Sequence, residues 1–153
     1  FLFPAPARKK WTHPPAPVFL FMSAVIKNVG IIDYVSKWFD PLLDISPELT
    51  MLFVSALTGL ITQSNSASAA IVVPFLTIVL GYDGVNVLAA AAAAAGGSAV
   101  MQYYLTGGPV AALSTTIPVI PGSELKAANK FQRPSILGGL GVLFIIVALL
   151  SFF

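Results

Sequence analysis

Two apolar arms joined by a short polar segment are the most constraining feature of this sequence. In residues 47–82, the segment 62–68 is polar or small, whereas the residues on either side are almost all apolar. A helix needs about 20 apolar residues to cross a bilayer, and each arm is shorter. Backbone that leaves the helix within lipid must find partners inside protein or beside a water-filled cavity. We therefore predict a re-entrant helical hairpin over 47–82, with its tip at 64–66.

The composition indicates an integral membrane protein. Hydrophobic residues make up 57% of the chain and charged residues only 9%, whereas soluble proteins carry about 25% charged residues. Such a chain has too few polar side chains to cover a surface in water, so we expect the lipid bilayer to surround it. The net charge of +2 is interpreted as membrane topology, and no nucleic-acid partner is expected.

The residues needed for enzymatic chemistry are missing from the sequence. There is no cysteine, and the one histidine, His13, lies in a proline-rich, charged stretch typical of a solvated loop. Neither a thiolate nucleophile nor a Cys/His metal cluster can form from this set. No Ser-His-Asp set, carboxylate dyad or complete phosphate loop is present. We expect no enzyme activity, no cofactor and no metal beyond a coupling ion.

We predict an all-α polytopic membrane protein that is one half of an inverted-repeat transporter. Ser46, Pro47 and Glu48 are typical N-cap, first-position and first-turn residues for the start of the hairpin. The expected segments are a cytoplasmic Pro-rich basic segment at 1–16, a transmembrane helix at 17–38, the re-entrant hairpin at 47–82, a discontinuous transmembrane helix at 84–117 with a break at 96–108, an interfacial amphipathic arm at 118–133, and a transmembrane helix at 134–153.

The distribution of charges favours a re-entrant hairpin. Six of the eight basic residues lie in 8–10 and 126–133, and acidic residues such as Asp40 and Asp83 lie between these clusters. If the hairpin returns to the side it entered from, the two basic clusters share the cytoplasmic side, as the positive-inside rule requires. A hairpin that crossed completely would place them on opposite sides.

The hairpin tip is the first candidate binding site. Ser64, Asn65 and Ser66 begin the second arm, and a helix N-terminus favours anions. The carbonyl groups that end the first arm suit a cation, so Na⁺ is expected at Ser64 and Asn65. Serine and asparagine side chains serve either ligand. The alternative is that these residues only form a hairpin turn and satisfy each other.

The second break repeats this chemistry, and two ionisable residues are candidates for coupling. We expect Gly96, Gly97 and Ser98 at the start of this break, and Thr106 near its end, to complete the site from the discontinuous helix. Ionisable residues within a membrane are candidates for function, which singles out Asp33 and Lys27. The alternative for both is a structural contact with another part of the protein.

The order of elements and the tip motif resemble the C-terminal half of organic-anion carriers of the Ion Transporter superfamily. Residues 64–70 read Ser-Asn-Ser-Ala-Ser-Ala-Ala, similar to the Ser-Asn-Thr signature of divalent anion:sodium symporters, whose tip binds substrate carboxylate and sodium. C4-dicarboxylate and lactate permeases share this plan. The sequence departs from the pattern at Ser66, where threonine is usual, and in 96–108, which lacks a Gly-Thr-Pro-Pro type of sequence.

This resemblance implies an elevator-type secondary transporter that moves a small organic anion of the carboxylate class by symport with Na⁺ or H⁺. It implies a multi-pass protein of a prokaryotic inner membrane, dimeric in its full form, whose N-terminal half is further sequence or a partner subunit. Two alternatives stay open. One is a small non-transporting membrane subunit of a larger complex, and the other is a channel-forming subunit whose hairpin lines a pore.

Overall fold

The computed structural model describes residues 21, 24–25, 28–105 and 124–152. Helices are the regular structure of this part, which confirms the all-α class for the described residues. They are α2 (Ile31–Leu43), α3 (Pro47–Thr62), α4 (Asn65–Val79), α5 (Val87–Met101) and α7 (Leu125–Leu150). Three parts of the prediction lie outside the described residues. They are the segment 1–16, most of the part of the first transmembrane helix that precedes residue 28, and the stretch 106–123.

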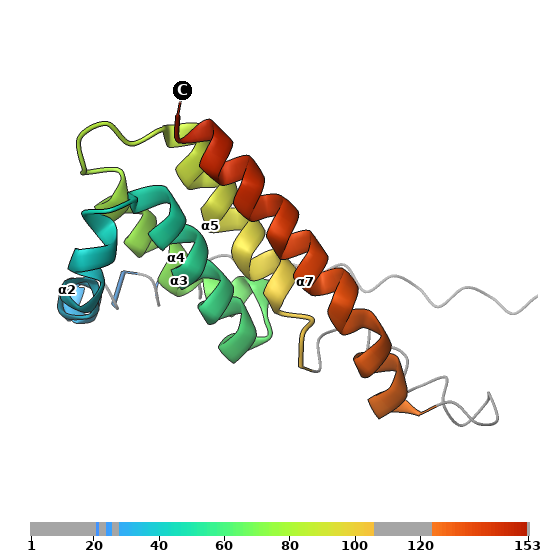
Figure 1. Cartoon of the computed structure of the whole chain (residues 1–153). Helices are drawn as coiled ribbons and strands as arrows, with labels where there is room; N and C mark the ends of the chain where they lie inside the picture. Colours follow the sequence, from blue (N-terminus) through green and yellow to red (C-terminus); the bar gives the residue numbers. More distant parts are fainter. Residues whose placement is uncertain (1–20, 22–23, 26–27, 106–123, 153) are drawn as a thin grey trace, which may run out of the picture.

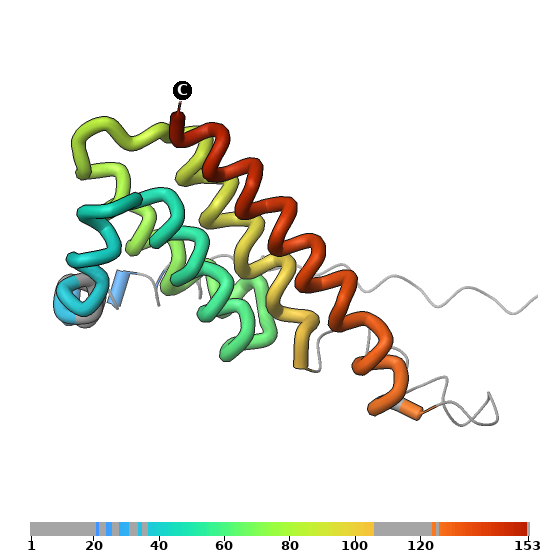
Figure 2. The backbone as a smooth tube through the Cα atoms, in the orientation of Figure 1, coloured from blue at the N-terminus to red at the C-terminus, as the bar shows by residue number. Residues whose placement is uncertain are grey.

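Four of these helices lie side by side and alternate in direction. The chain descends through α3, returns through α4, descends again through α5 and returns through α7 (Figures 1 and 2). Helix α3 is central, because it packs against α4, α5 and α7, and its most extensive contact is with α5. Helix α2 packs against α3 and α4. The open end of the α3–α4 hairpin therefore lies at the same end of the bundle as the C-terminus (Figure 1).

A helical hairpin occupies the predicted range, with the expected signals at its start and its turn. Ser46 caps α3, since its Oγ accepts a hydrogen bond from the Leu49 N–H at 3.3 Å, and Pro47 takes the first helical position. Gln63 ends α3 in the left-handed conformation, with φ of 51°. Ser64 then caps α4. The hairpin is thus present as two helices and a tight turn, and its re-entrance in a membrane belongs to the proposal below.

Helices α3 and α5 approach so closely that glycine is required at their contact. A Cβ atom at Gly59 would lie 2.6 Å from the Cα and carbonyl oxygen of Ser98. One at Gly97 would lie 2.9 Å from the Leu52 carbonyl oxygen and the Ala56 nitrogen. The alanine-rich face of α5 continues this surface of small residues, which is how helices approach closely in membrane proteins.

A buried serine joins the same two helices by hydrogen bonds. The Ser55 Oγ donates to the Ala94 carbonyl oxygen at 2.6 Å and accepts from the Ser98 N–H at 2.9 Å. In a regular α-helix that carbonyl and that N–H bond to each other. The hydroxyl of α3 therefore bridges one step of the hydrogen-bond ladder of α5, and it fixes the register between the helices.

Three boundaries differ from those predicted. A turn at residues 29–30, with Gly30 in the left-handed conformation (φ 73°), interrupts the predicted helix 17–38, and α2 continues past Asp40 and Pro41 to Leu43. Helix α5 continues through Gly96–Ser98 in helical conformation and ends at Met101, because Gly97 is needed at the contact with α3 rather than as a helix break. Residues 102–105 then form a turn. Helix α7 runs from Leu125 through Pro134 to Leu150, so the predicted interfacial arm and last transmembrane helix are continuous. Side chains of its first turns hold it against the 102–105 turn, on the N-terminal side of the proline.

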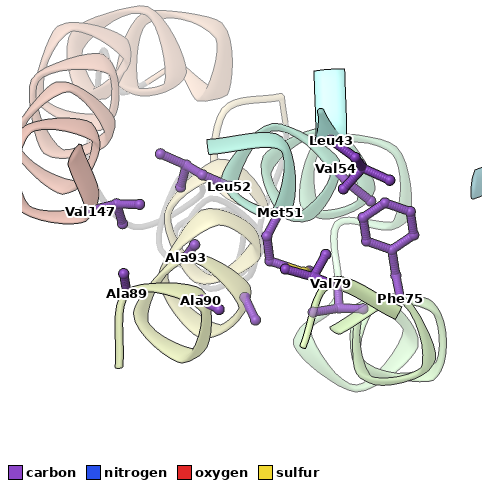
Figure 3. Close-up of a cluster of buried hydrophobic side chains, with 12 residues drawn as sticks. Leu43, Met51, Leu52, Val54, Phe75, Val79, Ala89, Ala90, Ala93 and Val147 are labelled. Atoms are coloured by element: carbon purple, nitrogen blue, oxygen red, sulfur yellow. The ribbon is translucent and has the colours of Figure 1, made fainter. Parts of the chain in front are cut away.

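The buried core lies between α3, α4 and α5, with contributions from the ends of α2 and α7. Met51, Phe75 and Val79 are almost completely buried. The Met51 and Val79 side chains meet, and the Phe75 ring points toward Leu43 and Val54 (Figure 3). Alanines of α5 and Val147 of α7 close the other side of this cluster. Phe39 of α2 packs edge-on against Phe75, with ring centroids 5.9 Å apart.

Among the described helices, one is long and apolar enough to span a membrane. It covers Lys126–Leu150, and the most apolar 18-residue window of this stretch has a mean hydropathy of 2.1 and is only 6% buried. Large side chains such as Leu137, Val142 and Ile145 are exposed on its surface. An apolar surface of this extent suits lipid or a partner helix, and it supports an association with the membrane. The helices α3, α4 and α5 are apolar but shorter.

Glu48 ties the start of α3 to the start of α5. Its side chain is only 4% exposed. The Oε1 atom accepts from the Asn86 N–H at 2.9 Å, and the Oε2 atom accepts from the Ser46 hydroxyl at 3.5 Å. Asn86 in turn caps α5 through its Oδ1, which accepts from the N–H groups of Leu88 and Ala89. The carboxylate therefore lies beside two helix N-termini, where negative charge is favourable.

We expect Glu48→Ala to lower the free energy of unfolding by about 2 kcal/mol, because it leaves the Asn86 N–H without an acceptor. Glu48→Gln should lower the free energy of unfolding clearly less, since its amide oxygen can still accept that hydrogen bond. Denaturant unfolding in detergent micelles, followed by circular dichroism, measures both. Asp44→Ala, at an exposed carboxylate, is the control for loss of charge alone. Equal losses for Glu48→Ala and Asp44→Ala would contradict the prediction.

Candidate functional site

A groove between α4 and α5 brings together one residue from each predicted break. Its volume is about 420 Å³. Asn65 reaches it from the hairpin tip and Ser98 from α5, and these are the polar side chains among the described residues that line it. The remaining lining residues are Ala69, Val72, Val73 and Leu76 of α4, with Ala91, Ala94, Ala95 and Ala99 of α5. The groove thus has an apolar wall along both helices and polar groups from two separate segments.

The hairpin tip is divided into a bonded part and an accessible part. Thr62 Oγ1 lies 2.7 Å from Ser68 Oγ and donates to the Ser64 carbonyl oxygen at 3.2 Å. The Ser64 Oγ accepts from the Ala67 N–H at 3.4 Å, which caps α4. Asn65 and Ser66, by contrast, are exposed in the first turn of α4. The turn therefore satisfies part of its own polar groups and leaves two predicted site residues accessible to a ligand.

Thr62 and Ser68 belong to this tip although they were not among the predicted site residues. Their hydroxyl groups face each other across the helix break, six residues apart in the sequence. The signal that could have found them is the hydroxyl residue at each end of the polar segment 62–68, because such side chains commonly bond within a turn.

The other predicted site residues are distributed around α5 and beyond. Gly97 lies against α3, and a Cβ at Gly96 would lie 2.5 Å from Leu143 of α7, so both glycines face neighbouring helices. Ser98 is 6% exposed and is the residue of this group that lines the groove. Asp33 belongs to α2, but its side chain lies outside what the structure describes. Lys27 and Thr106 also lie outside the described residues.

The groove offers hydrogen bonds without a formal charge. Asparagine supplies one acceptor oxygen and two N–H donors, and serine supplies a hydroxyl that can donate or accept a hydrogen bond. The first N–H groups of α4 have no partner within the helix and add a partial positive charge at Asn65. In the described part of the chain, no three His, Cys, Asp or Glu side chains could together hold a metal ion. A cation here would therefore depend on hydroxyl, amide and carbonyl oxygens.

No protein-family model, curated protein or solved structure matches this chain. The resemblance to Ion Transporter superfamily carriers stays a prediction from the tip motif at 64–70 and the order of elements in the sequence.

Proposed function

We propose that this chain is the membrane-embedded part of a secondary active transporter for a small organic anion, a carboxylate in the simplest case. The observation that carries the proposal is the groove that Asn65 and Ser98 line together. Small-molecule sites are typically apolar pockets in which a few polar groups from different elements converge. A groove of about 420 Å³ is within the usual size of such sites.

Helix lengths support a hairpin that enters the bilayer and turns back. Helices α3 and α4 have 16 and 15 residues, which corresponds to about 24 and 22 Å at 1.5 Å per residue. Both values are below the ~30 Å thickness of the hydrocarbon core. With its polar tip at Ser64–Ser66, such a hairpin would end beside protein or water rather than lipid. Helix α7, with 26 residues, is long enough to cross.

In the proposed mechanism the substrate carboxylate binds at the first turn of α4. The free N–H groups there, the Asn65 amide and the Ser98 hydroxyl would share its negative charge. A Na⁺ ion would bind between Ser64, Asn65 and the carbonyl groups that end α3. Proton coupling would instead need a titratable group, for which Asp33 and Lys27 are the candidates. The hairpin and α5 would move as a unit against a scaffold from the rest of the protein or a partner subunit.

A non-transporting membrane subunit is the second candidate function. The observation that favours it is the surface of α7. Apart from the backbone of α7 itself, no atom of the described residues lies within 4 Å of a Cβ built at Gly138 or Gly141, and the surrounding side chains are apolar and exposed. Small residues on an apolar helix allow another helix to approach closely. In that case the partner's helices would fill the α4–α5 groove, and no substrate would bind there.

Uptake into proteoliposomes by the full-length protein separates these two functions. We expect Asn65→Ala and Ser98→Ala each to lower carboxylate uptake about tenfold, since each removes a hydrogen bond to a charged ligand. Radiolabelled lactate and succinate serve as the probes, with an imposed Na⁺ or H⁺ gradient. Thr77→Val is the matched control, because this exposed threonine of α4 bonds only to carbonyl groups of its own helix. Undiminished uptake by both alanine variants would exclude the proposed site.

A further inference from the structure

Arg133 of α7 presents a cationic group that nothing in the proposed transport site uses. Its guanidinium lies over the ring of Tyr104, with the Cζ atom 5.2 Å from the ring centroid. Its Nε is buried and has no hydrogen-bond partner. Because the Nε is closed off and the side chain as a whole is only half-buried, the terminal Nη groups are the donors that a ligand can reach. The same arginine has no ion pair with any acidic residue in the described part of the chain.

The position of this arginine is fixed by the turn beneath it. The Gln132 Nε2 donates to the Tyr103 carbonyl oxygen at 2.9 Å, and the Asn129 Nδ2 donates to the Leu105 carbonyl oxygen. Gln132 also donates to the Asn129 Oδ1 at 3.2 Å. The residues on both sides of Tyr104 are therefore held against α7. Its ring forms a fixed platform that orients the guanidinium plane, so little ordering is needed when a ligand binds.

Positive charge is concentrated on this end of α7. Lys126 and Lys130 are exposed, and their spacing to Arg133 places the three on one side of the helix. Glu124, exposed and just before the helix, is the acidic residue nearest in sequence, and it forms no ion pair with them in the described structure. From Pro134 to Leu150, α7 contains no charged residue. The basic face thus ends where the long apolar stretch begins, which is where the headgroups of a bilayer lie if α7 crosses it.

We propose that this basic face binds the phosphate of an anionic phospholipid, with Arg133 as the main ligand and Lys130 and Lys126 as neighbouring charges. The planar guanidinium matches the geometry of a phosphate and binds it through two parallel hydrogen bonds. Basic pockets at the ends of membrane helices attract such headgroups. The inference rests on α7 lying in a membrane but is independent of transport, because none of its residues lines the α4–α5 groove.

The test uses the full chain in neutral phosphatidylcholine nanodiscs, to which phosphatidylglycerol is added. The chain has two arginines, Arg8 and Arg133, so the Nε–H resonance of Arg133 can be assigned by a single substitution in a ¹⁵N-labelled sample. We expect this resonance to shift in a saturable way with phosphatidylglycerol. Inorganic phosphate at equal concentration should leave it in place. An equal or larger shift with inorganic phosphate would mean a site for small anions and would overturn the lipid proposal.

Variants distinguish a specific site from general charge attraction. Native mass spectrometry of the protein with bound phosphatidylglycerol gives the affinity of each variant. We expect Arg133→Gln to bind at least about tenfold more weakly. Arg133→Lys keeps the charge and the fold but loses the planar fork, so its affinity should fall in between. Lys37→Gln removes one exposed positive charge on α2 and should have little effect. A similar loss for Lys37→Gln and Arg133→Gln would overturn the proposal.

Discussion

A Gly59→Leu substitution is expected to lower the free energy of unfolding by at least about 3 kcal/mol. Even a Cβ atom at this position would lie 2.6 Å from backbone atoms of Ser98, and backbone cannot rotate aside as a side chain can. To remove this steric overlap, α3 and α5 must move apart, and that movement would also break both hydrogen bonds of Ser55. Chemical unfolding in detergent micelles, followed by circular dichroism, measures the loss.

Gly138→Leu is the matched control for this prediction. Gly138 lies within α7, and apart from the backbone of its own helix no atom of the described residues lies within 4 Å of a Cβ built there. Leucine is a better helix former than glycine, so this variant should be unchanged or stabilised by up to about 1 kcal/mol. Gly59→Ala should already destabilise the protein, against its favourable helix propensity. If Gly59→Leu and Gly138→Leu had equal effects, α3 and α5 would not pack as closely as described.

The same contact positions the candidate site. Gly59 lies opposite Ser98, and Ser98 lines the groove with Asn65. Close packing of α3 on α5 therefore determines where the Ser98 hydroxyl lies relative to the hairpin tip. Variants that force the helices apart should disturb the groove as well as the fold, so loss of uptake in Gly59→Leu would not by itself identify a ligand contact.

The local signals in the sequence were sufficient to find the hairpin. Ser46 before Pro47 marks the start of a helix, and a small polar segment between two apolar runs marks its turn. These features depend on residues within one helical turn of each other, and the structure has a helix start and a turn at those places. The hydroxyl-rich tip likewise depends on neighbours in sequence, and it contains the predicted Ser64–Ser66.

The glycines of α5 could not be interpreted from local sequence. Gly96 and Gly97 together suggest a helix break, because glycine is a poor helix former. In the structure each glycine instead faces another helix, Gly97 toward Leu52 and Ala56 and Gly96 toward Leu143. Those partners are 41 to 47 residues away in sequence, and no residue near the glycines predicts these contacts. The Ser55 bridge to Ala94 is of the same kind, since it joins residues 39 apart.

The pairing of Asn65 with Ser98 was predicted, but the geometry behind it was different. The sequence pattern predicts Ser98 in a second helix break opposite the first. In the structure Ser98 lies within continuous helix, with its N–H bonded to Ser55. Helix α5 offers its side chain rather than a free helix end to the groove. Of the two helices that line this groove in the described part of the chain, α4 alone therefore contributes the partial positive charge of a helix N-terminus.

Filling the groove should abolish uptake without unfolding the protein. Ala95 of α5 is exposed and lines the groove, so a phenylalanine there would occupy the space in which the substrate is proposed to bind. We expect Ala95→Phe to reduce carboxylate uptake by the full-length protein to the level of empty liposomes. Its unfolding midpoint should stay within a few degrees of the unmodified protein, because the new ring displaces no buried side chain.

Ala69→Phe and Ala127→Phe complete this experiment. Ala69 lies on the opposite wall of the groove, in α4, so Ala69→Phe should block uptake as Ala95→Phe does. Ala127 is exposed near the start of α7 and lines no part of the groove, so Ala127→Phe should transport normally. Normal uptake by both groove variants would mean that the substrate does not bind between α4 and α5. The groove would then be a helix-docking surface, as a non-transporting subunit requires.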